Sequence, residues 1–358
     1  MNFNNYSDDM LKEYIIDAKK RLGERLLIPA HHYVGRDIID IADITGDSYK
    51  LAVDVSRSNA EFIVFCGVRF MADGAKILAS ENQHILHPEP DAGCPMADMI
   101  NEETAEKAVE KISNECSREI IPLVYMNSDA DSKSFCGRKG GAVCTSSNAE
   151  KLVQHFLDKG KSIFFFPDYH LGANTAKKLN IDESLIVKVE RDISFEDKDI
   201  KNGRMFLWDG FCPIHQEFDD EDIISMRKKY PASKIIVHPE TKSSVFSLSD
   251  ISGSTQKIFD NIAKAKDGSI WIVGTETTFV NRIAETFPKQ TVLPLKQSPC
   301  KNMIKINLKN TAETIKSVED FIDGKGVLKN EVFVENRLRE NAKIALNRMI
   351  DIVEDKEN

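Results

Sequence analysis

The sequence has little that would let the chain bind nucleic acid or enter a membrane. Its 48 basic side chains are outnumbered by 57 acidic ones, for a net charge of −9, whereas nucleic acids and anionic membranes are bound by clustered Lys and Arg. No apolar run approaches the roughly 20 residues that span a bilayer. The opening stretch, MNFNNYSDDMLKEYII, lacks the basic start and apolar core of a secretory signal. We therefore expect a soluble, cytoplasmic protein with no nucleic-acid or membrane partner.

The sequence also lacks closely spaced cysteine pairs. None of its seven cysteines forms a CxxC motif, which excludes zinc ribbons and thioredoxin-type motifs, and the CxxxCxxC triplet of radical S-adenosylmethionine enzymes is missing as well. Disulfides are not expected in a reducing cytosol. If any of these thiols bind metal, the ligands must therefore come from distant parts of the chain.

What the chain does have is a series of continuous apolar runs, each followed by a helix-like segment. With 358 residues it is long enough for two or three domains. Runs of this length between helices are typical of parallel strands buried on both faces, so we predict an α/β fold. The runs are RLLIPAHHY, EFIVFCG, IIPLVYMN, KSIFFFPDYH, KIIVHPE and SIWIVGTE.

These runs belong to three similar copies. Each copy starts with a strand that ends in polar side chains, continues with a hydroxyl residue where a helix can begin, and closes with a loop cysteine beside a proline. The steps between these features are nearly equal in the first and third copies and longer in the middle one, which carries the glycine-rich SFCGRKGGAVC. The strand-end residues are His31 and Tyr33, Tyr125 and Asn127, and His238 and Glu240; the hydroxyls are Ser48, Ser146 and Thr255; the cysteines are Cys94, Cys212 and Cys300.

The copies predict three related α/β domains at residues 1–100, 101–212 and 213–300, with 301–358 packing back on the first. Ligands of such sheets bind beyond the carboxyl ends of the strands. Three domains that face one another would therefore gather their polar residues at one central site. Each hydroxyl could also be a plain N-cap, which is worth about 1 kcal/mol.

Three cysteines at one point suit a [4Fe–4S] cluster with one iron left open. Four cysteines normally close every iron of an electron-transfer cluster, whereas an open iron can bind substrate as a Lewis acid, a chemistry suited to dehydration. Among the other thiols, Cys66 is expected in the core and Cys116 to be incidental. Cys136 and Cys144 flank the glycine-rich insert, and their role stays open.

Residues 25 to 310 resemble the quinolinate synthase family. The resemblance rests on many motifs in a fixed order, which makes it specific, and the glycine-rich insert resembles the longer subgroup. The motifs are AHHY with GDS, GVRFMADGAKIL, AGCPMAD, YMNSDADSK, CTSSNA, PDYHLGANTA, WDGFCPIH, VHPE, GST, GTE and PCKNM.

The resemblance implies a transferase of NAD biosynthesis. Members condense iminosuccinate with dihydroxyacetone phosphate to give quinolinate, phosphate and water. It also implies three homologous three-layer αβα domains with parallel sheets around a pseudo-threefold axis, and one [4Fe–4S] cluster per chain on Cys94, Cys212 and Cys300. Pathway logic adds the expectation of a transient contact with the aspartate oxidase that makes iminosuccinate.

The resemblance further implies roles for the strand-end residues. The positions that contact iminosuccinate match His31, Ser48, Tyr125, Asn127, Ser146, His238, Glu240 and Thr255. His31 and His238 are candidates for proton transfer because an unperturbed histidine pKa is near 6.5. Glu240 could accept a proton or orient an imine, and Tyr125 is expected to be catalytic. Tyr33 resembles the family tyrosine that relays a proton in the closing steps of ring formation. His215, three residues after Cys212, is expected to line the cluster cavity without ligating it.

The sequence departs from the family pattern at few points. Thr241 stands where many members have a cysteine after HPE, and Asp73 and Gly74 replace a common glutamate and threonine. The C-terminal segment has the apolar spacing of an amphipathic helix. Three other functions remain open from the residues alone: an aconitase-type hydro-lyase, a non-enzymatic iron–sulfur protein, and an α/β protein that binds a phosphorylated metabolite.

Overall fold

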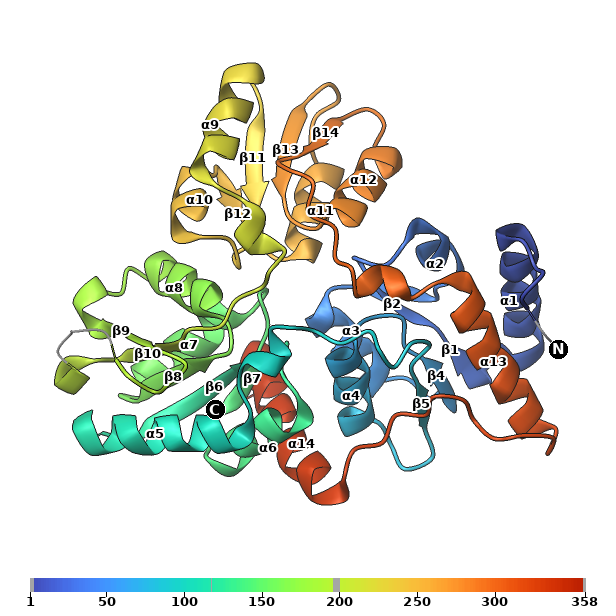
Figure 1. Ribbon diagram of the computed structural model, residues 1–358, viewed down its shortest axis with the longest axis horizontal. Helices are drawn as coiled ribbons and strands as arrows, with labels where there is room; N and C mark the ends of the chain where they lie inside the picture. The colour runs from blue at the N-terminus through green and yellow to red at the C-terminus, as the bar shows by residue number, and fades with distance from the viewer. Residues whose placement is uncertain (1–2, 117, 196–199, 357–358) are drawn as a thin grey trace. The chain divides into compact units, whose positions relative to one another are not determined.

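The computed structural model describes residues 3–116, 118–195 and 200–356, and it confirms the α/β class. Helices follow strands through most of the chain (Figure 1). Every pairing between named strands in the described residues is parallel. The chain divides into two compact units, Met1–Cys94 with Pro299–Val334 and Pro95–Ser298 with Glu335–Asn358.

The first unit holds five short strands and five α-helices among its described residues. Strands β2 and β3 pair with each other, and β1, β4 and β5 form a second ladder in the order β1-β4-β5. The elements are α1 (Asp8–Leu22), β1 (Leu26–Leu27), β2 (Pro29–His31), α2 (Arg36–Ile41), β3 (Ile44–Gly46), α3 (Ser48–Ser56), β4 (Phe62–Val64), α4 (Arg69–Leu78), β5 (His84–Leu86) and α13 (Leu308–Ile322).

The second unit contains two parallel sheets. The first has the order β7-β6-β8-β10-β9, and the second has the order β12-β11-β13-β14. The elements of the first sheet and its helices are α5 (Glu102–Cys116), β6 (Ile120–Tyr125), α6 (Ala130–Arg138), β7 (Ala142–Cys144), α7 (Ala149–Asp158), β8 (Ser162–Phe166), α8 (Tyr169–Lys178), β9 (Ile186–Val189) and β10 (Met205–Trp208). The rest are α9 (Asp220–Lys229), β11 (Lys234–Val237), α10 (Ser243–Leu248), β12 (Ile251–Ser252), α11 (Thr255–Ala263), β13 (Ile270–Gly274), α12 (Thr277–Thr286), β14 (Thr291–Pro294) and α14 (Asn336–Val353).

The two sheets of the second unit share a strand order. In each, the first strand in sequence lies between the second and the third, as β6 does between β7 and β8 and β11 does between β12 and β13. In sheets with this strand order, ligands bind at the carboxyl ends of the first and third strands, because the connecting helices leave in opposite directions there. In the first unit β2 pairs with β3 on one side and bridges Cys66, just after β4, on the other. The common order supports the predicted repeat, while the three-domain division about an axis stays a prediction.

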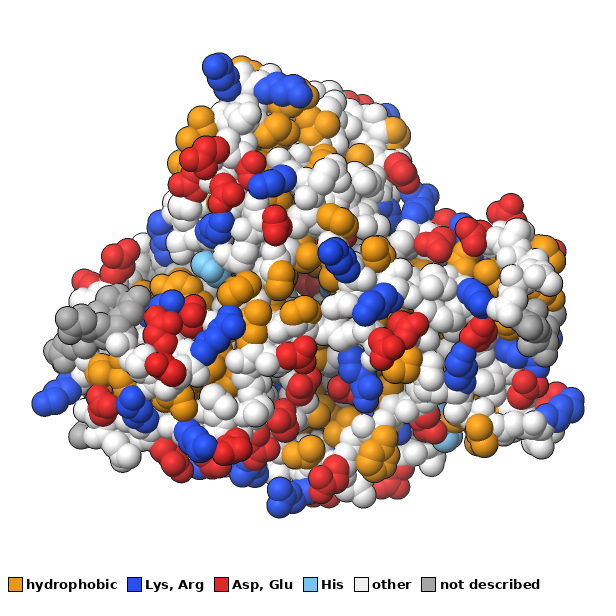
Figure 2. All heavy atoms as spheres, viewed as in Figure 1, with side chains coloured by type: hydrophobic (Ala, Val, Ile, Leu, Met, Phe, Trp, Pro, Cys, Tyr) orange, Lys and Arg blue, Asp and Glu red, His pale blue; other side chains and the backbone are white. Residues whose placement is uncertain are grey.

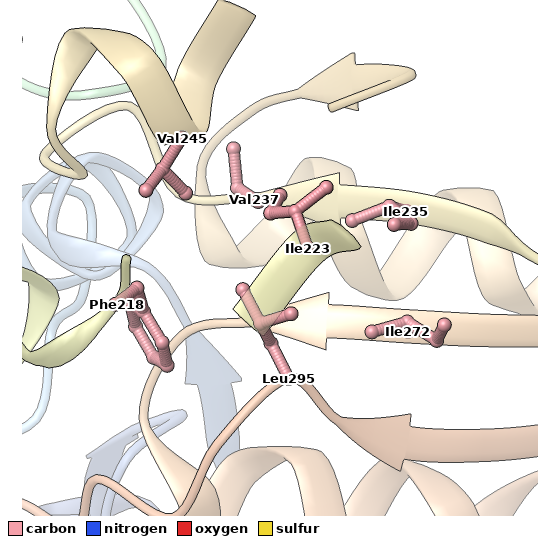
Figure 3. Packing of buried hydrophobic residues seen from close by; sticks show 7 residues of the cluster. All are labelled: Phe218, Ile223, Ile235, Val237, Val245, Ile272 and Leu295. Atoms are coloured by element: carbon pink, nitrogen blue, oxygen red, sulfur yellow. The ribbon is translucent and has the colours of Figure 1, made fainter. Parts of the chain in front are cut away.

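Apolar side chains fill both faces of these sheets, as the continuous runs predicted. Strand β8 is buried along its whole length. In the last sheet, Figure 3 shows Ile235 and Val237 of β11 and Ile272 of β13 near Phe218 and Leu295, with Ile223 and Val245 from the covering helices. Burying side chains of this size contributes about 1.5–3 kcal/mol each. This burial stabilises the strands whose ends carry the polar side chains.

The C-terminal segment 301–358 was expected to pack on the first domain, and the structure divides it. Helix α13 belongs to the first unit and packs against α1, whereas α14 packs against α6 of the second unit (Figure 1). Gly137 of α6 permits the packing of α14 against α6, because a Cβ at this position would lie 1.9 Å from the carbonyl oxygen of Asn341 in α14. Only glycine allows the two helix backbones this close.

Charges of both signs are interspersed over the face drawn in Figure 2. This distribution agrees with the sequence, in which acidic residues outnumber basic ones. In the parts of the chain that the structure describes, no helix combines the length and apolarity that a membrane crossing requires.

Candidate active site

The second unit brings together polar residues from the ends of four strands. Tyr125 is the last residue of β6, and Ser146 follows β7 by two positions. His238 follows β11 directly, as Thr275 follows β13. In the second and third copies, the polar residues at the strand ends thus lie together. The side chains of Tyr125, Ser146, His238 and Glu240 form one connected cluster.

Glu240 lies at the centre of this cluster. It is 2% exposed, and each of its carboxylate oxygens has a neighbour. The Tyr125 hydroxyl donates a hydrogen bond to Oε1, and Nδ1 of His215 lies 2.7 Å from Oε2. A buried charge is tolerated only with such partners, so the surroundings of Glu240 are built to hold a carboxylate.

His238 forms the second half of the cluster. Its Nε2 lies 3.2 Å from the Ser146 hydroxyl, and its Nδ1 lies 3.9 Å from Oε2 of Glu240. The ring of His238 stacks on that of His215, with centroids 4.5 Å apart and planes 19° from parallel. Thr241, the departure after HPE, is fully buried and donates its hydroxyl to the His238 carbonyl at 2.9 Å. Its side chain thus secures the turn that carries His238 and Glu240.

Burial and neighbouring groups shift the pKa values of both residues. Burial lowers the pKa of His238 to about 3, against the opposing attraction of the Glu240 carboxylate. For Glu240, burial raises the pKa, but His238, His215 and the Tyr125 hydroxyl together outweigh it and bring the pKa below its usual value. Near neutral pH the cluster therefore offers an uncharged imidazole beside a carboxylate, two groups that can accept protons.

Two other predicted contacts have features that suit a ligand. The Oδ1 atom of Asn127, two residues beyond β6, is buried and has no hydrogen-bond partner in the described part of the chain. Buried polar atoms are almost always paired, so this oxygen fits a contact with a bound molecule. Thr255 is the first residue of α11 and is 3% exposed.

The first unit holds the remaining strand-end residues. His31 ends β2 opposite Gly46 of β3, and Ser48 begins α3 two residues later. The rings of His31 and Tyr33 lie edge to face with centroids 4.9 Å apart, and the Tyr33 backbone N–H donates to Nδ1 of His31 at 3.2 Å. The first copy thus repeats the pattern of a strand-end histidine beside a helix start.

The hydroxyls of Ser48 and Thr255 are not the caps of their helices. Asp47 caps α3 by accepting from the Lys50 backbone N–H at 3.0 Å, and Ser254 caps α11 through the Lys257 backbone N–H at 3.4 Å. The predicted hydroxyls instead occupy the first helical position. Their side chains are therefore left for another partner beside the positive end of the helix dipole.

Burial separates the seven cysteines into two groups. All are thiols rather than disulfides, and only the three predicted ligands, Cys94, Cys212 and Cys300, are partly exposed; the buried ones are Cys66, Cys116, Cys136 and Cys144. Burial raises the pKa of Cys66 to about 12 and those of Cys136 and Cys144 well above the ordinary value. Since metals bind the thiolate, the three accessible thiols suit ligation and these three buried ones do not.

Cys212 has neighbours that sequence reasoning placed only in part. Its thiol, a ring nitrogen of His215 and a carboxylate oxygen of Glu240 lie within 4.8 Å of one another. Asp168 was missed as a site residue: it is fully buried, accepts the Leu171 N–H at 2.6 Å as the cap of α8, and takes a backbone hydrogen bond from Cys212. Burial, and then the Glu240 charge, raise the pKa of Asp168 well above its usual range. Its place directly beyond an apolar run, in PDYH, is the signal that could have found it.

Buried ionisable groups gathered at the carboxyl ends of parallel strands are typical of active sites. The fold and the cluster around Glu240 are therefore those of an α/β enzyme with a candidate active site at the strand ends.

Comparison with known proteins gives its family. The family model described as "NadA: Quinolinate synthetase A protein" matches residues 13–351. Proteins named "Quinolinate synthase" from Bacillus anthracis (strain A0248), Bacillus cereus (strain AH187) and Bacillus thuringiensis (strain Al Hakam) are each 39% identical over 352 residues, 97% of this chain and 94% of theirs. The chain belongs to the quinolinate synthase family, as the resemblance of its motifs implied.

Proposed function

We propose that the chain condenses iminosuccinate with dihydroxyacetone phosphate to give quinolinate, inorganic phosphate and two molecules of water, as a step of NAD biosynthesis. Family membership supports the reaction type. The observation that carries the assignment to this chain is the buried Glu240 carboxylate, held by Tyr125 and His215 beside an uncharged His238. Forming a pyridine ring requires repeated proton transfers at carbon and nitrogen, for which these groups are suited.

The residues of the second unit have separate roles in proton transfer and substrate binding. Glu240 accepts the N–H of the imine and orients it, while the Tyr125 hydroxyl holds the other carboxylate oxygen. His238, uncharged at neutral pH, takes a proton from carbon. Ser146 and Thr255, at or near helix starts, bind substrate carboxylate or phosphate with their hydroxyls. Asn127 supplies the amide that contacts iminosuccinate.

The residues of the first unit have proposed roles of their own. His31 transfers protons, Tyr33 relays one in the closing steps, and Ser48 binds an anionic group of the substrate. This assignment follows the family motifs and the shared strand-end position. It goes with the proposed division into three αβα domains at residues 1–100, 101–212 and 213–300.

The proposed cofactor is one [4Fe–4S] cluster held by Cys94, Cys212 and Cys300. The three thiols fit this role because they are the accessible cysteines of the chain and each lies beside a proline. When bound, such a cluster supplies an open iron that acts as a Lewis acid on a hydroxyl leaving as water. His215 contacts Glu240 instead of serving as a fourth ligand. We also propose a cytoplasmic location and a transient contact with an aspartate oxidase that supplies the unstable imine.

Quinolinate formation by anaerobically purified protein tests the proposal. The wild-type chain, given both substrates, should form quinolinate, and Glu240→Gln should lower kcat by roughly 10²–10⁴-fold, the usual contribution of acid–base catalysis. Glu217→Gln, at an exposed site nearby, is the matched control and should keep full activity. A wild-type chain that holds its iron but forms no quinolinate would contradict the proposed reaction. Such a chain should then be assayed as a hydro-lyase.

A further inference from the structure

The turn that carries Glu240 is held through its backbone carbonyls. Asn174 of α8 donates from Nδ2 to the carbonyl of Pro239 at 2.9 Å and to the carbonyl of Thr241 at 2.7 Å. These two residues flank Glu240 in the sequence. The carbonyl of Glu240 itself accepts from Nε2 of Gln216 at 3.0 Å. Side chains from two other parts of the chain thus hold successive carbonyls of the turn.

The chemistry of Asn174 suits this double contact. The side chain is fully buried on α8, and its amide nitrogen carries two hydrogens, one for each carbonyl. An amide turned the other way would place its oxygen against two carbonyl oxygens, which is repulsive, so the nitrogen faces them. The amide oxygen accepts from the Ser243 hydroxyl at 3.0 Å. Neither a carboxylate nor an apolar side chain of this size has two donors to offer.

The flanking carbonyls restrain the direction of the Glu240 side chain. The Pro239 carbonyl lies in the peptide plane directly before Glu240, and the Thr241 carbonyl lies near the end of the turn. Because each peptide unit is planar, holding its carbonyl fixes the plane as a whole. The Glu240 carboxylate is then kept where it accepts the hydrogen bond of the Tyr125 hydroxyl. A displacement of about 1 Å at a reacting group can lower the rate about 10²-fold.

We propose that Asn174 is a positioning residue of this enzyme: by holding the carbonyls on either side of Glu240, its amide keeps the Glu240 carboxylate in contact with the Tyr125 hydroxyl. The catalytic part rests on the proposed function, because Asn174 acts through Glu240. All of these residues lie in one unit of the chain. Ser243 bonds the other atom of the amide, so it supplies a matched control.

Kinetics of two Asn174 variants and two controls test the catalytic part. Asn174→Ala removes the amide, and Asn174→Asp keeps the shape but replaces the donor nitrogen by oxygen. Each should lower kcat about tenfold, which corresponds to 1.36 kcal/mol, while KM for both substrates and iron content stay near wild-type values. Ser243→Ala removes only the bond to the amide oxygen, which water can replace at this partly exposed position. Gly137→Ala lowers stability through its clash with α14, and both controls should keep the wild-type kcat.

Three kinetic outcomes would overturn the proposal. The first is a wild-type kcat in either Asn174 variant. The second is a loss of kcat that a control shares or that falling iron content explains, because lower stability or a lost cluster would then account for it. The third is the failure of both Asn174 variants to fold, since Asn174 would then be required for the fold as a whole.

A spectroscopic measurement tests the positioning without relying on activity. The full chain is labelled with ¹³Cζ-tyrosine, and the Tyr125 signal is identified by its loss in Tyr125→Phe. Its position reports the hydrogen bond from Tyr125 to Glu240. Ser243→Ala should keep the wild-type signal, and both Asn174 variants should shift it. An unchanged signal in the Asn174 variants would refute the positioning role even if the chain makes quinolinate. The predicted signals from a chain that makes none would instead contradict the proposed function alone.

Discussion

Acid should destabilise the second unit through His238, and the size of the effect follows from its burial. The folded-state pKa of His238 is about 3, whereas the unfolded value is about 6.5. As the pH falls through 6.5, the unfolded chain takes up a proton at this residue and the folded chain does not, so stability is lost. Between pH 7 and pH 5 the linkage relation gives a loss of about 2 kcal/mol from this one residue. A folded pKa anywhere below about 4 gives the same figure, because the folded group stays uncharged throughout this range.

Tryptophan fluorescence is a suitable assay, because both tryptophans of the chain, Trp208 and Trp271, are buried in the second unit. Urea unfolding of the metal-free protein at pH 7 and pH 5 gives the loss for wild type and for His238→Gln. Burial also lowers the pKa values of His87 and His170, so the variant should still lose stability, but by about 2 kcal/mol less than wild type. An equal loss of unfolding free energy in both proteins would show that His238 is not held uncharged. It would also contradict the proposed role of His238 as a base.

Five further substitutions distinguish structural roles from catalytic ones. Ser254→Ala removes the cap of α11, so it should lower the unfolding free energy by about 1 kcal/mol and leave kcat unchanged. Thr255→Val should keep the unfolding free energy and raise KM. Urea titration and steady-state kinetics measure both quantities, and the reverse pattern would contradict the assignment of Ser254 as the cap and Thr255 as a substrate contact. Gly137→Ala should lower the unfolding free energy by about 1–3 kcal/mol through the clash with α14, and a neutral result in thermal unfolding would mean that the helices are not in contact. Cys212→Ser should abolish bound iron, whereas Cys116→Ser should retain it; equal iron content in the two variants would remove Cys212 from the ligands.

The sequence predicted the strand-end residues well because two simple signals coincide there. Apolar runs mark strands buried on both faces, and the polar residue after each run must lie at the carboxyl edge of the sheet. Tyr125 and His238 follow from this rule. Asp168 and Thr275 obey it too, but the first reads as a turn residue and the second as a hydroxyl in a short common motif, so neither was singled out.

Other features depend on packing that the sequence does not encode locally. Asp47 and Ser48 are both good cap residues, so the pattern could not decide which of them caps α3. The spacing of α14 showed an apolar face without saying which surface covers it. The contact between His215 and Glu240 arises from the way the loop after β10 folds over the end of β11, and no spacing rule predicts that.

The most direct test of the account measures iron, sulfide and quinolinate on one anaerobic sample, with Cys94→Ala, Cys212→Ala and Cys300→Ala beside wild type. The account predicts about four irons per chain and quinolinate from both substrates in wild type, and the loss of both in all three variants. Quinolinate formation by a variant that holds no iron would contradict the proposed cluster chemistry. A wild-type chain that binds no iron under strict exclusion of oxygen would contradict the central claim.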